Sequence, residues 1–126
     1  MIAVVPQIHL VRGDVVWVDL RGAVGHEKQQ ARPCLVIQND IGNTVSPLTI
    51  IMPITDAAQY KGFPMQVLLS AADLQVADAK DSVIEGGHIR SIDRDERIDA
   101  TRGVWCHLSD EVMHKVDDAL RASLSL

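Results

Sequence analysis

Short apolar segments separated by polar turns run along most of the chain. These segments are rich in β-branched and aromatic residues, a composition typical of strands. The pattern predicts strands over residues 14–20, 35–38, 48–52, 65–69, 82–85 and 102–107. Turn-forming residues at 39–43 indicate a loop, and Pro53 is expected to end the third strand. A brief helical turn is expected within 92–98.

The last segment follows a helical period instead. Ser109 is a favourable N-cap, and the acidic residues Asp110 and Glu111 stabilise a helix N-terminus. Apolar residues then recur at helical spacing and form one stripe: Val112, Val116, Ala119, Leu120 and Leu124. The sequence therefore predicts an amphipathic C-terminal helix over 109–124.

The fold class follows from the order of these elements, because many short strands without strand–helix alternation are typical of a small barrel. The 126 residues suffice for one domain, so we predict a single, mainly β domain over 1–126. Residues 1–10 are expected to form an N-terminal strand or arm, since they lack the basic start of a signal peptide. The apolar stretches are far shorter than the roughly 20 residues that span a membrane. A cytoplasmic protein without membrane association is expected.

Acidic and basic residues are unevenly distributed. Residues 1–70 carry five basic and five acidic side chains, so the net charge of −5 arises from residues 71–126. A protein that binds nucleic acid without specificity usually carries a basic surplus. Any nucleic acid must therefore bind in a local pocket, and positive charge is densest between residues 21 and 32. Aromatic residues that stack on bases are scarce.

The spacing of potential metal ligands predicts no metal site, and no cofactor is expected. The five histidines show no HxH or HxxxH spacing, and the chain contains no CxxC motif. The two cysteines, Cys34 and Cys106, each lie within an apolar run. Buried free thiols are therefore expected, and a disulfide between the two is the alternative.

The most concentrated polar chemistry lies in residues 25–43. A glycine-led loop there comes before an apolar run and carries four ionisable side chains: His26, Glu27, Lys28 and Arg32. Binding and catalytic groups often lie on loops that a rigid scaffold holds. These residues are therefore candidates for a functional site, and an ordinary polar surface loop is the alternative.

A set of motifs recurs in a familiar order: RGDVVWVDL (12–20), GHE (25–27), RP (32–33), VIQND (36–40) with Asn43, PIT (53–55), KGFP (61–64), DSVI (81–84) and IRSID (89–93). The set resembles the MazF/PemK (Kid) family of toxin endoribonucleases over roughly residues 11–122. The resemblance implies an SH3-like small barrel of the MazF/PemK/CcdB type with appended helices. It also implies a toxin that cleaves single-stranded mRNA, works as a homodimer and is inhibited by a cognate MazE/PemI-like antitoxin.

RNA can be cleaved without a metal, because its own 2′-hydroxyl is the nucleophile. The protein must then accept a proton, stabilise the charged phosphorane and protonate the leaving 5′-oxygen. The planar fork of Arg32 matches two phosphate oxygens, and a plain surface arginine is its alternative role. The resemblance places a functional hydroxyl at Thr55, which otherwise only ends a strand.

The same loop supplies two further catalytic candidates. The unperturbed pKa of a histidine is about 6.5, so His26 is suited to accept and donate a proton near neutral pH. Kid-type relatives carry histidine at this position, whereas many MazF relatives carry serine. Glu27 belongs to the GxE core of the family, where it orients Arg32, acts as a base or fixes the loop. The RNA-binding candidates are Arg21, Lys28, Lys61, His88 and Arg90.

The chain departs from the family pattern at Gly87-His88, where many relatives read Asp-Gln. In Kid-type relatives that aspartate is proposed to be the base. Either the proton chemistry falls to His26 or His88, or cleavage is slow or absent, and His88 lining a dimer interface is a further alternative. Two other functions stay open: a non-enzymatic CcdB-like toxin that binds DNA gyrase, and a degenerate binding module. Arg32-Pro33 together with Thr55 favours the nuclease.

Overall fold

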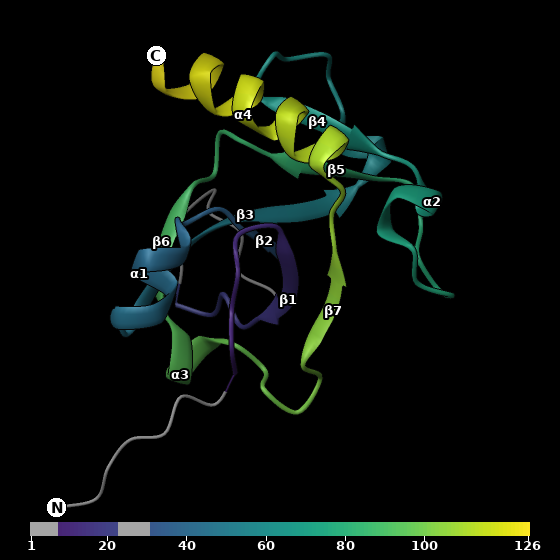
Figure 1. Cartoon of the computed structure of the whole chain (residues 1–126). Helices are drawn as coiled ribbons and strands as arrows, with labels where there is room; N and C mark the ends of the chain where they lie inside the picture. Colours follow the sequence, from purple (N-terminus) through teal and green to yellow (C-terminus); the bar gives the residue numbers. More distant parts are fainter. Residues whose placement is uncertain (1–7, 23–30) are drawn as a thin grey trace, which may run out of the picture.

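The computed structural model describes residues 8–22 and 31–126 (Figure 1). Within these ranges the strands are β1 (Asp14–Val18), β2 (Arg32–Val36), β3 (Leu48–Asp56), β4 (Gln66–Leu69), β5 (Ser82–Glu85), β6 (Arg90–Asp93) and β7 (Val104–His107). The helices are α1 (Asp40–Val45), α2 (Ala71–Leu74), α3 (Arg94–Arg97) and α4 (Asp110–Leu124), with a 3-10 turn at Ala57–Gln59.

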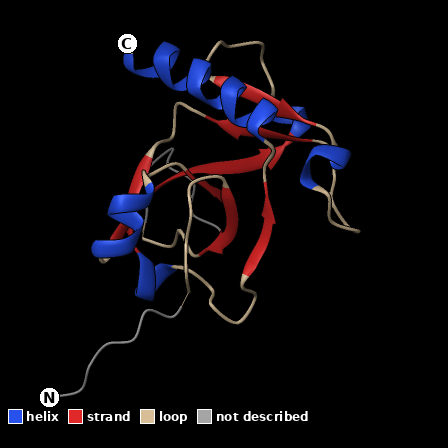
Figure 2. Cartoon of the chain, in the orientation of Figure 1, coloured by secondary structure: helices blue, strands red, loops and turns tan. Residues whose placement is uncertain are grey.

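The strands form an antiparallel sheet in the order β4-β5-β3-β2-β1-β7, and β6 also pairs with β3. The long strand β3 joins its parts, because it pairs with β6 and β2 over its first two thirds and with β5 at its end. The sheet curls into a half-barrel, and α4 lies across β4 and β5 (Figures 1 and 2). The predicted mainly β, SH3-like fold with a C-terminal helix is confirmed, while a single domain over 1–126 stays a prediction.

The third strand is longer than predicted, since β3 does not end at Pro53 but continues to Asp56. Proline lacks an N–H donor, yet its fixed φ suits an extended chain. Pro53 pairs with Cys34 of β2, and the residues after it pair with β5. The missing donor thus falls where β3 exchanges one partner strand for another. As a result Thr55 is the second-last residue of β3 and pairs with Val83 of β5.

The helices confirm two predictions and correct a third. Helix α4 is the predicted C-terminal helix, and the Ser109 side chain caps it by accepting a backbone hydrogen bond at 3.2 Å. Helix α3 provides the helical turn expected within 92–98. The loop predicted at 39–43 is wrong, because Asn39 acts as an N-cap and accepts a hydrogen bond from the Gly42 N–H at 2.8 Å, which starts α1. Strand β6 and helix α2 were not predicted.

Two apolar clusters pack against opposite faces of the sheet, following the alternation of side chains along β1. Val15 belongs to the first cluster, which also contains the apolar face of α4. Val16 and Val18 belong to the second, which also contains Cys34. Cys34 and Cys106 are both free thiols. None of the described helices is long and apolar enough to cross a membrane.

Candidate functional site

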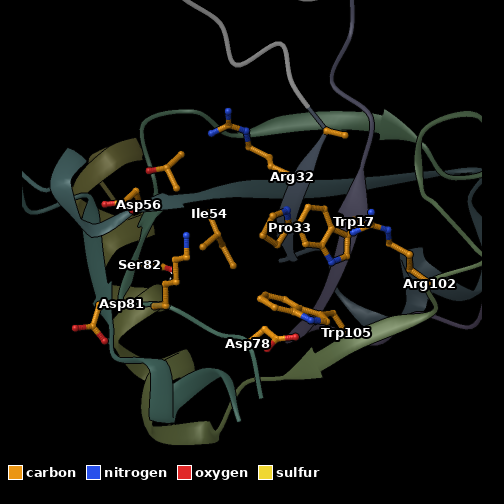
Figure 3. Close-up of a pocket in the computed structure, with 13 residues that line it drawn as sticks. Trp17, Arg32, Pro33, Ile54, Asp56, Asp78, Asp81, Ser82, Arg102 and Trp105 are labelled. Atoms are coloured by element: carbon orange, nitrogen blue, oxygen red, sulfur yellow. Dashed lines mark hydrogen bonds between the residues drawn. The ribbon is translucent and has the colours of Figure 1, made fainter. Parts of the chain in front are cut away.

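A pocket of about 890 Å³ opens where the end of β3 and the start of β5 face β1, β2 and β7 (Figure 3). Pro33, at the start of β2, lies between its two walls. One wall carries Ile54 and Ser82, and the opposite wall carries Trp17 and Trp105 (Figure 3). The pocket is therefore assembled from strands that are far apart in the sequence.

Arg32 and Thr55 line this pocket from neighbouring strands. The β2–β3 register pairs Cys34 with Pro53, and Arg32 and Thr55 lie two residues beyond that pair on their respective strands. The Arg32 Nε and the Thr55 Oγ1 are both buried, and neither has a hydrogen-bond partner among the described residues. Buried polar atoms are nearly always hydrogen-bonded. These two atoms therefore stand out as polar atoms of the pocket-lining residues that lack a partner among the described residues.

Among the described residues that line the pocket, positive and negative side chains are equal in number. The cations are Arg32, Lys80 and Arg102, and the anions are Asp56, Asp78 and Asp81. The carboxylates of Asp56 and Asp81 each accept a backbone N–H, at 2.8 and 2.9 Å, which fixes them at the pocket edge. The pocket thus offers separate positive and negative groups and not a uniformly basic surface.

Two of the predicted site arginines act on the same buried thiol. Burial raises the pKa of the Cys34 thiol to about 12, and the charges of Arg32 and Arg90 oppose that rise. Arg90 comes from β6, where it pairs with Ile51 of β3. Arg90 does not line the large pocket, but it brings a second positive charge to the strand that carries Arg32.

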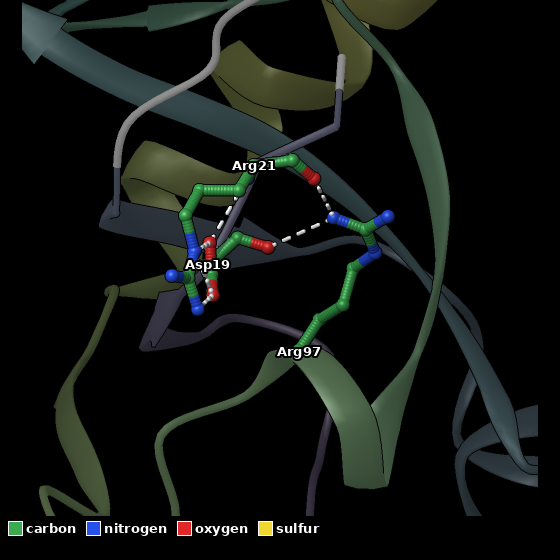
Figure 4. Close-up of polar contacts among 3 residues, drawn as sticks. All are labelled: Asp19, Arg21 and Arg97. Carbon is green, nitrogen blue, oxygen red and sulfur yellow. Dashed lines mark hydrogen bonds and ion pairs between the residues drawn. The ribbon is translucent and has the colours of Figure 1, made fainter.

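Arg21 lies in an adjoining pocket of about 510 Å³, which shares Trp17 and Arg102 with the first. Its guanidinium pairs with the Asp19 carboxylate at 2.6 Å. Hydrogen bonds from Arg21 therefore lower the pKa of Asp19. Arg97 donates from one nitrogen to the backbone carbonyls of Asp19 and Arg21, at 3.1 and 2.8 Å (Figure 4). This network fixes the chain where it leaves β1.

The other predicted residues are placed elsewhere or not described. Lys61 and His88 line a third pocket of about 240 Å³, together with Phe63 and Gly87. The structure therefore brings Arg32 and Thr55 together and separates Lys61 and His88 from them within one chain. His26, Glu27 and Lys28 lie outside the described residues. Among the described residues, no group of three or more His, Cys, Asp or Glu side chains is arranged to hold a metal ion.

The two glycines before His88 differ in their surroundings. A Cβ on Gly86 would lie 2.2 Å from the Met65 carbonyl oxygen, which is closer than any side chain allows. The Gly86 N–H donates to that same oxygen at 2.9 Å, and the Gly86 carbonyl accepts from the Ser123 hydroxyl at 2.7 Å. A Cβ on Gly87 would meet only the Met65 side chain, at 3.7 Å. Gly86 is therefore required by packing, and Gly87 is not.

Sequence reasoning missed the aromatic wall of the large pocket. The scarcity of aromatic residues was expected to leave few stacking surfaces, yet both tryptophans of the chain line this one pocket. One signal was present, because Trp17 lies on the strand before the Arg32 segment. The placement of Trp105 depends on the pairing of β1 with β7, which sequence spacing does not reveal.

Known proteins resemble this chain in sequence and in fold. A family model described as PemK-like, MazF-like toxin of type II toxin-antitoxin system matches residues 11–124. Endoribonuclease EndoA of Bacillus subtilis (strain 168) is 44% identical over 115 residues, which cover 91% of this chain and 94% of EndoA. The structure of MazF (Form-I) from Deinococcus radiodurans superposes with a TM-score of 0.73 and 28% identity, covering 93% of this chain and 97% of that chain.

A second solved structure extends the likeness at the level of the fold. An endoribonuclease from a mycobacterial species, solved in complex with its cognate antitoxin, has a TM-score of 0.73 and 20% identity. The match covers 93% of this chain and 96% of that chain. The curled sheet with its C-terminal helix is thus common to these proteins.

Proposed function

Since this chain belongs to the PemK-like, MazF-like toxins of type II toxin–antitoxin systems, we propose that it cleaves single-stranded mRNA at specific sequences. Its class as an endoribonuclease follows from the family and from its 44% identity to EndoA. The proposed reaction is attack of a 2′-hydroxyl on the adjacent phosphate, without a metal. The products would be a 2′,3′-cyclic phosphate and a 5′-hydroxyl. Because mRNA is the substrate, we place the protein in the cytoplasm.

The observation that carries this proposal is that the Arg32 Nε and the Thr55 Oγ1, whose residues line the same pocket, have no hydrogen-bond partner among the described residues. A phosphate that enters the pocket can accept a hydrogen bond from each. Negative charge grows on the phosphate oxygens as the phosphorane forms, so these contacts strengthen in the transition state. Arg32 is suited to stabilise that charge and not to move a proton, because a guanidinium stays protonated. The same pair favours the nuclease over a non-enzymatic gyrase-binding toxin.

We assign the proton transfer to His26 or Glu27, which precede Arg32 in the sequence. An imidazole with a pKa near about 6.5 can accept the 2′-hydroxyl proton near neutral pH. If His26 is the base, the cleavage rate should rise with pH up to neutrality and His26→Ala should be slow. A flat profile from about pH 5 to 8 with an active His26→Ala protein would assign the role to Glu27 or to substrate positioning.

The test incubates the purified protein with a long RNA in the presence of EDTA and maps both new ends. We expect cleavage at a limited set of sequences, with 5′-hydroxyl ends and cyclic or 3′-phosphates. Products with a 5′-phosphate and a 3′-hydroxyl, or loss of activity with EDTA, would contradict the mechanism. A wild-type protein that folds but cuts no RNA would leave the gyrase-binding toxin or the degenerate binding module as the function.

We further propose a homodimer that a cognate antitoxin inhibits. The mycobacterial structure with its cognate antitoxin supports the second part. A two-fold axis repeats one surface on both subunits, so a groove along the interface would present two copies of the Arg32 and Thr55 pair. Sedimentation at micromolar concentration tests this assembly, and a monomer alone would refute it.

A further inference from the structure

The two tryptophans of the chain form one wall of the large pocket. Trp17 of β1 and Trp105 of β7 pack edge to face, with ring centroids 5.7 Å apart and an interplanar angle of 66°. Both side chains are partly exposed. Trp105 packs against the first apolar cluster and also lines the pocket, so the core supports it while part of it stays accessible. The pair therefore presents a rigid aromatic surface to whatever enters the pocket.

A tight turn holds a guanidinium on the same wall. The Arg102 guanidinium carbon lies 4.2 Å from the centroid of the Trp17 ring. The Asp99 carboxylate fixes the turn, because it pairs with the Arg102 Nε at 3.3 Å and accepts from the Thr101 hydroxyl at 2.6 Å. The Asp99 N–H also donates to the Trp17 carbonyl at 2.9 Å, and Gly103 supplies a φ of 63°. The position of Arg102 over Trp17 is thus built by the turn.

We propose that the aromatic wall, defined as Trp17, Arg102 and Trp105, is a stacking site for a nucleobase that neighbours the scissile phosphate. This inference rests on the proposed function for its substrate, single-stranded RNA. Base stacking on aromatic side chains and on arginine planes is the common way in which proteins hold unpaired bases. The wall faces the same pocket that Arg32 and Thr55 line, so phosphate and base are bound together.

This wall explains how an acidic chain holds RNA. The charges that the described residues place around the pocket sum to zero, so phosphates there depend on individual cations such as Arg32 and not on a net positive charge. Stacking needs no net charge, and every base offers a ring face. The wall therefore contributes mainly to affinity. A purine has the larger ring system and should be favoured at the stacked position.

The experiment uses the intrinsic fluorescence of the full chain, because both of its tryptophans lie in the wall. The probe is a pool of 2′-O-methyl oligonucleotides of random sequence, which cannot be cleaved. Binding should quench the fluorescence of the wild type. Trp17→Phe leaves Trp105 as the sole fluorophore and should keep the quench. Trp105→Leu should weaken binding about 5- to 140-fold, the factor expected for one lost base stack, and Trp105→Phe should restore part of it.

An abasic scan separates stacking from a structural role. Once the cleaved sequence is mapped, single abasic residues are placed at each position of a 2′-O-methyl oligonucleotide of that sequence. One abasic position next to the scissile phosphate should abolish the fluorescence quench. It should also abolish the difference in affinity between the wild type and Trp105→Leu. A structural role would leave that difference the same at every position. Tyr60→Leu, an exposed aromatic outside the pocket, is the matched control and should bind as the wild type does.

The outcomes distinguish this inference from the proposed function. RNA cleavage with no quench, and with a folded Trp105→Leu protein that keeps its affinity, overturns the stacking site and leaves the nuclease intact. Quenching by the pool without any cleavage overturns the nuclease and supports the stacking site. No binding by the wild type overturns the stacking site. Urea unfolding of each variant verifies that it is folded before binding is measured.

Discussion

Arg32 and Thr55 are the residues on which the proposed chemistry depends most directly. Each offers one buried donor to the phosphate, and losing a donor used mainly in the transition state costs about 2.7–4 kcal/mol. Arg32→Ala and Thr55→Val should therefore each lower kcat/KM about 10²- to 10³-fold. Neither change removes a hydrogen bond that the described residues make, so urea unfolding should stay close to the wild type. Near-normal cleavage by a folded Arg32→Ala protein would remove Arg32 from the site.

Gly86 and Gly87 give a matched pair of substitutions. Gly86→Ala forces a methyl group against the Met65 carbonyl, and overpacking of this kind costs about 1–3 kcal/mol. Gly87→Ala meets only ordinary van der Waals contact, so its effect should stay within about 0.5 kcal/mol. Denaturant unfolding of both proteins measures the contrast. Equal stabilities would show that the turn shifts freely to accept the side chain.

Cys34 makes stability depend on pH in a predictable direction. Burial raises its pKa from 9.0 to about 12, so the folded state favours the protonated thiol. The contribution of Cys34 to the free energy of unfolding is fully present below about pH 9. It falls as the pH rises toward 12, by about 1.4 kcal/mol per pH unit. Urea unfolding between pH 8 and 11 should show the fall, and Cys34→Ala should reduce it. Burial also raises the pKa of the Cys106 thiol, to about 11. Its effect on stability is smaller because Cys106 is more exposed than Cys34.

Residue identity alone predicted only part of the site. Motif order singled out Arg32 and Thr55, and the register of β2 and β3 explains why both line the same pocket; their roles stay a prediction. Arg102 escaped prediction because its position depends on a turn held by Asp99, which is a tertiary arrangement. Side chains whose role comes from long-range pairing leave no local pattern to detect.

Among the secondary-structure elements, α4 matched prediction well because its signals are local. A cap, acidic residues in the first turn and an apolar stripe all agree. Helix α1 was mistaken for a loop, since asparagine and aspartate favour turns and N-caps alike. The extension of β3 past Pro53 depends on its pairing with other strands, and local residue propensities do not predict that pairing. Local rules thus predict elements where the chain provides its own start and stop signals.

The N-cap of α4 can be tested by itself. The Ser109 hydroxyl accepts the Val112 N–H at 3.2 Å, and replacing a serine cap with alanine costs about 1 kcal/mol. Ser109→Ala should therefore lower the free energy of unfolding by about that amount, whereas Ser109→Asp should restore it. Helix α4 covers the first apolar cluster, but none of its side chains lines the large pocket. The kcat of Ser109→Ala should therefore stay unchanged at temperatures where the protein is folded.

For the whole molecule, the central prediction concerns the antitoxin. An acidic, partly disordered segment would be drawn to the same positive groups that hold RNA, and it would fold on binding. Inhibition should then be competitive with RNA and should weaken as salt rises from about 0.1 to 1 M. Steady-state kinetics at several antitoxin concentrations measure both effects. A complex that holds antitoxin and RNA together, yet does not cleave, would refute simple occlusion.

The pairing of β1 with β7 also means that the large pocket is completed by strands from opposite ends of the chain. Asp14 and His107, hydrogen-bonded at 2.8 Å across these strands, are 93 residues apart in the sequence. Strands β2 and β3 follow one another closely, so the Arg32 and Thr55 half of the pocket can form on a nascent chain. The tryptophan half can form only after β7 has left the ribosome, because strands that are distant in the sequence pair late in folding. On a chain that is still being translated, the pocket would therefore lack its tryptophan half.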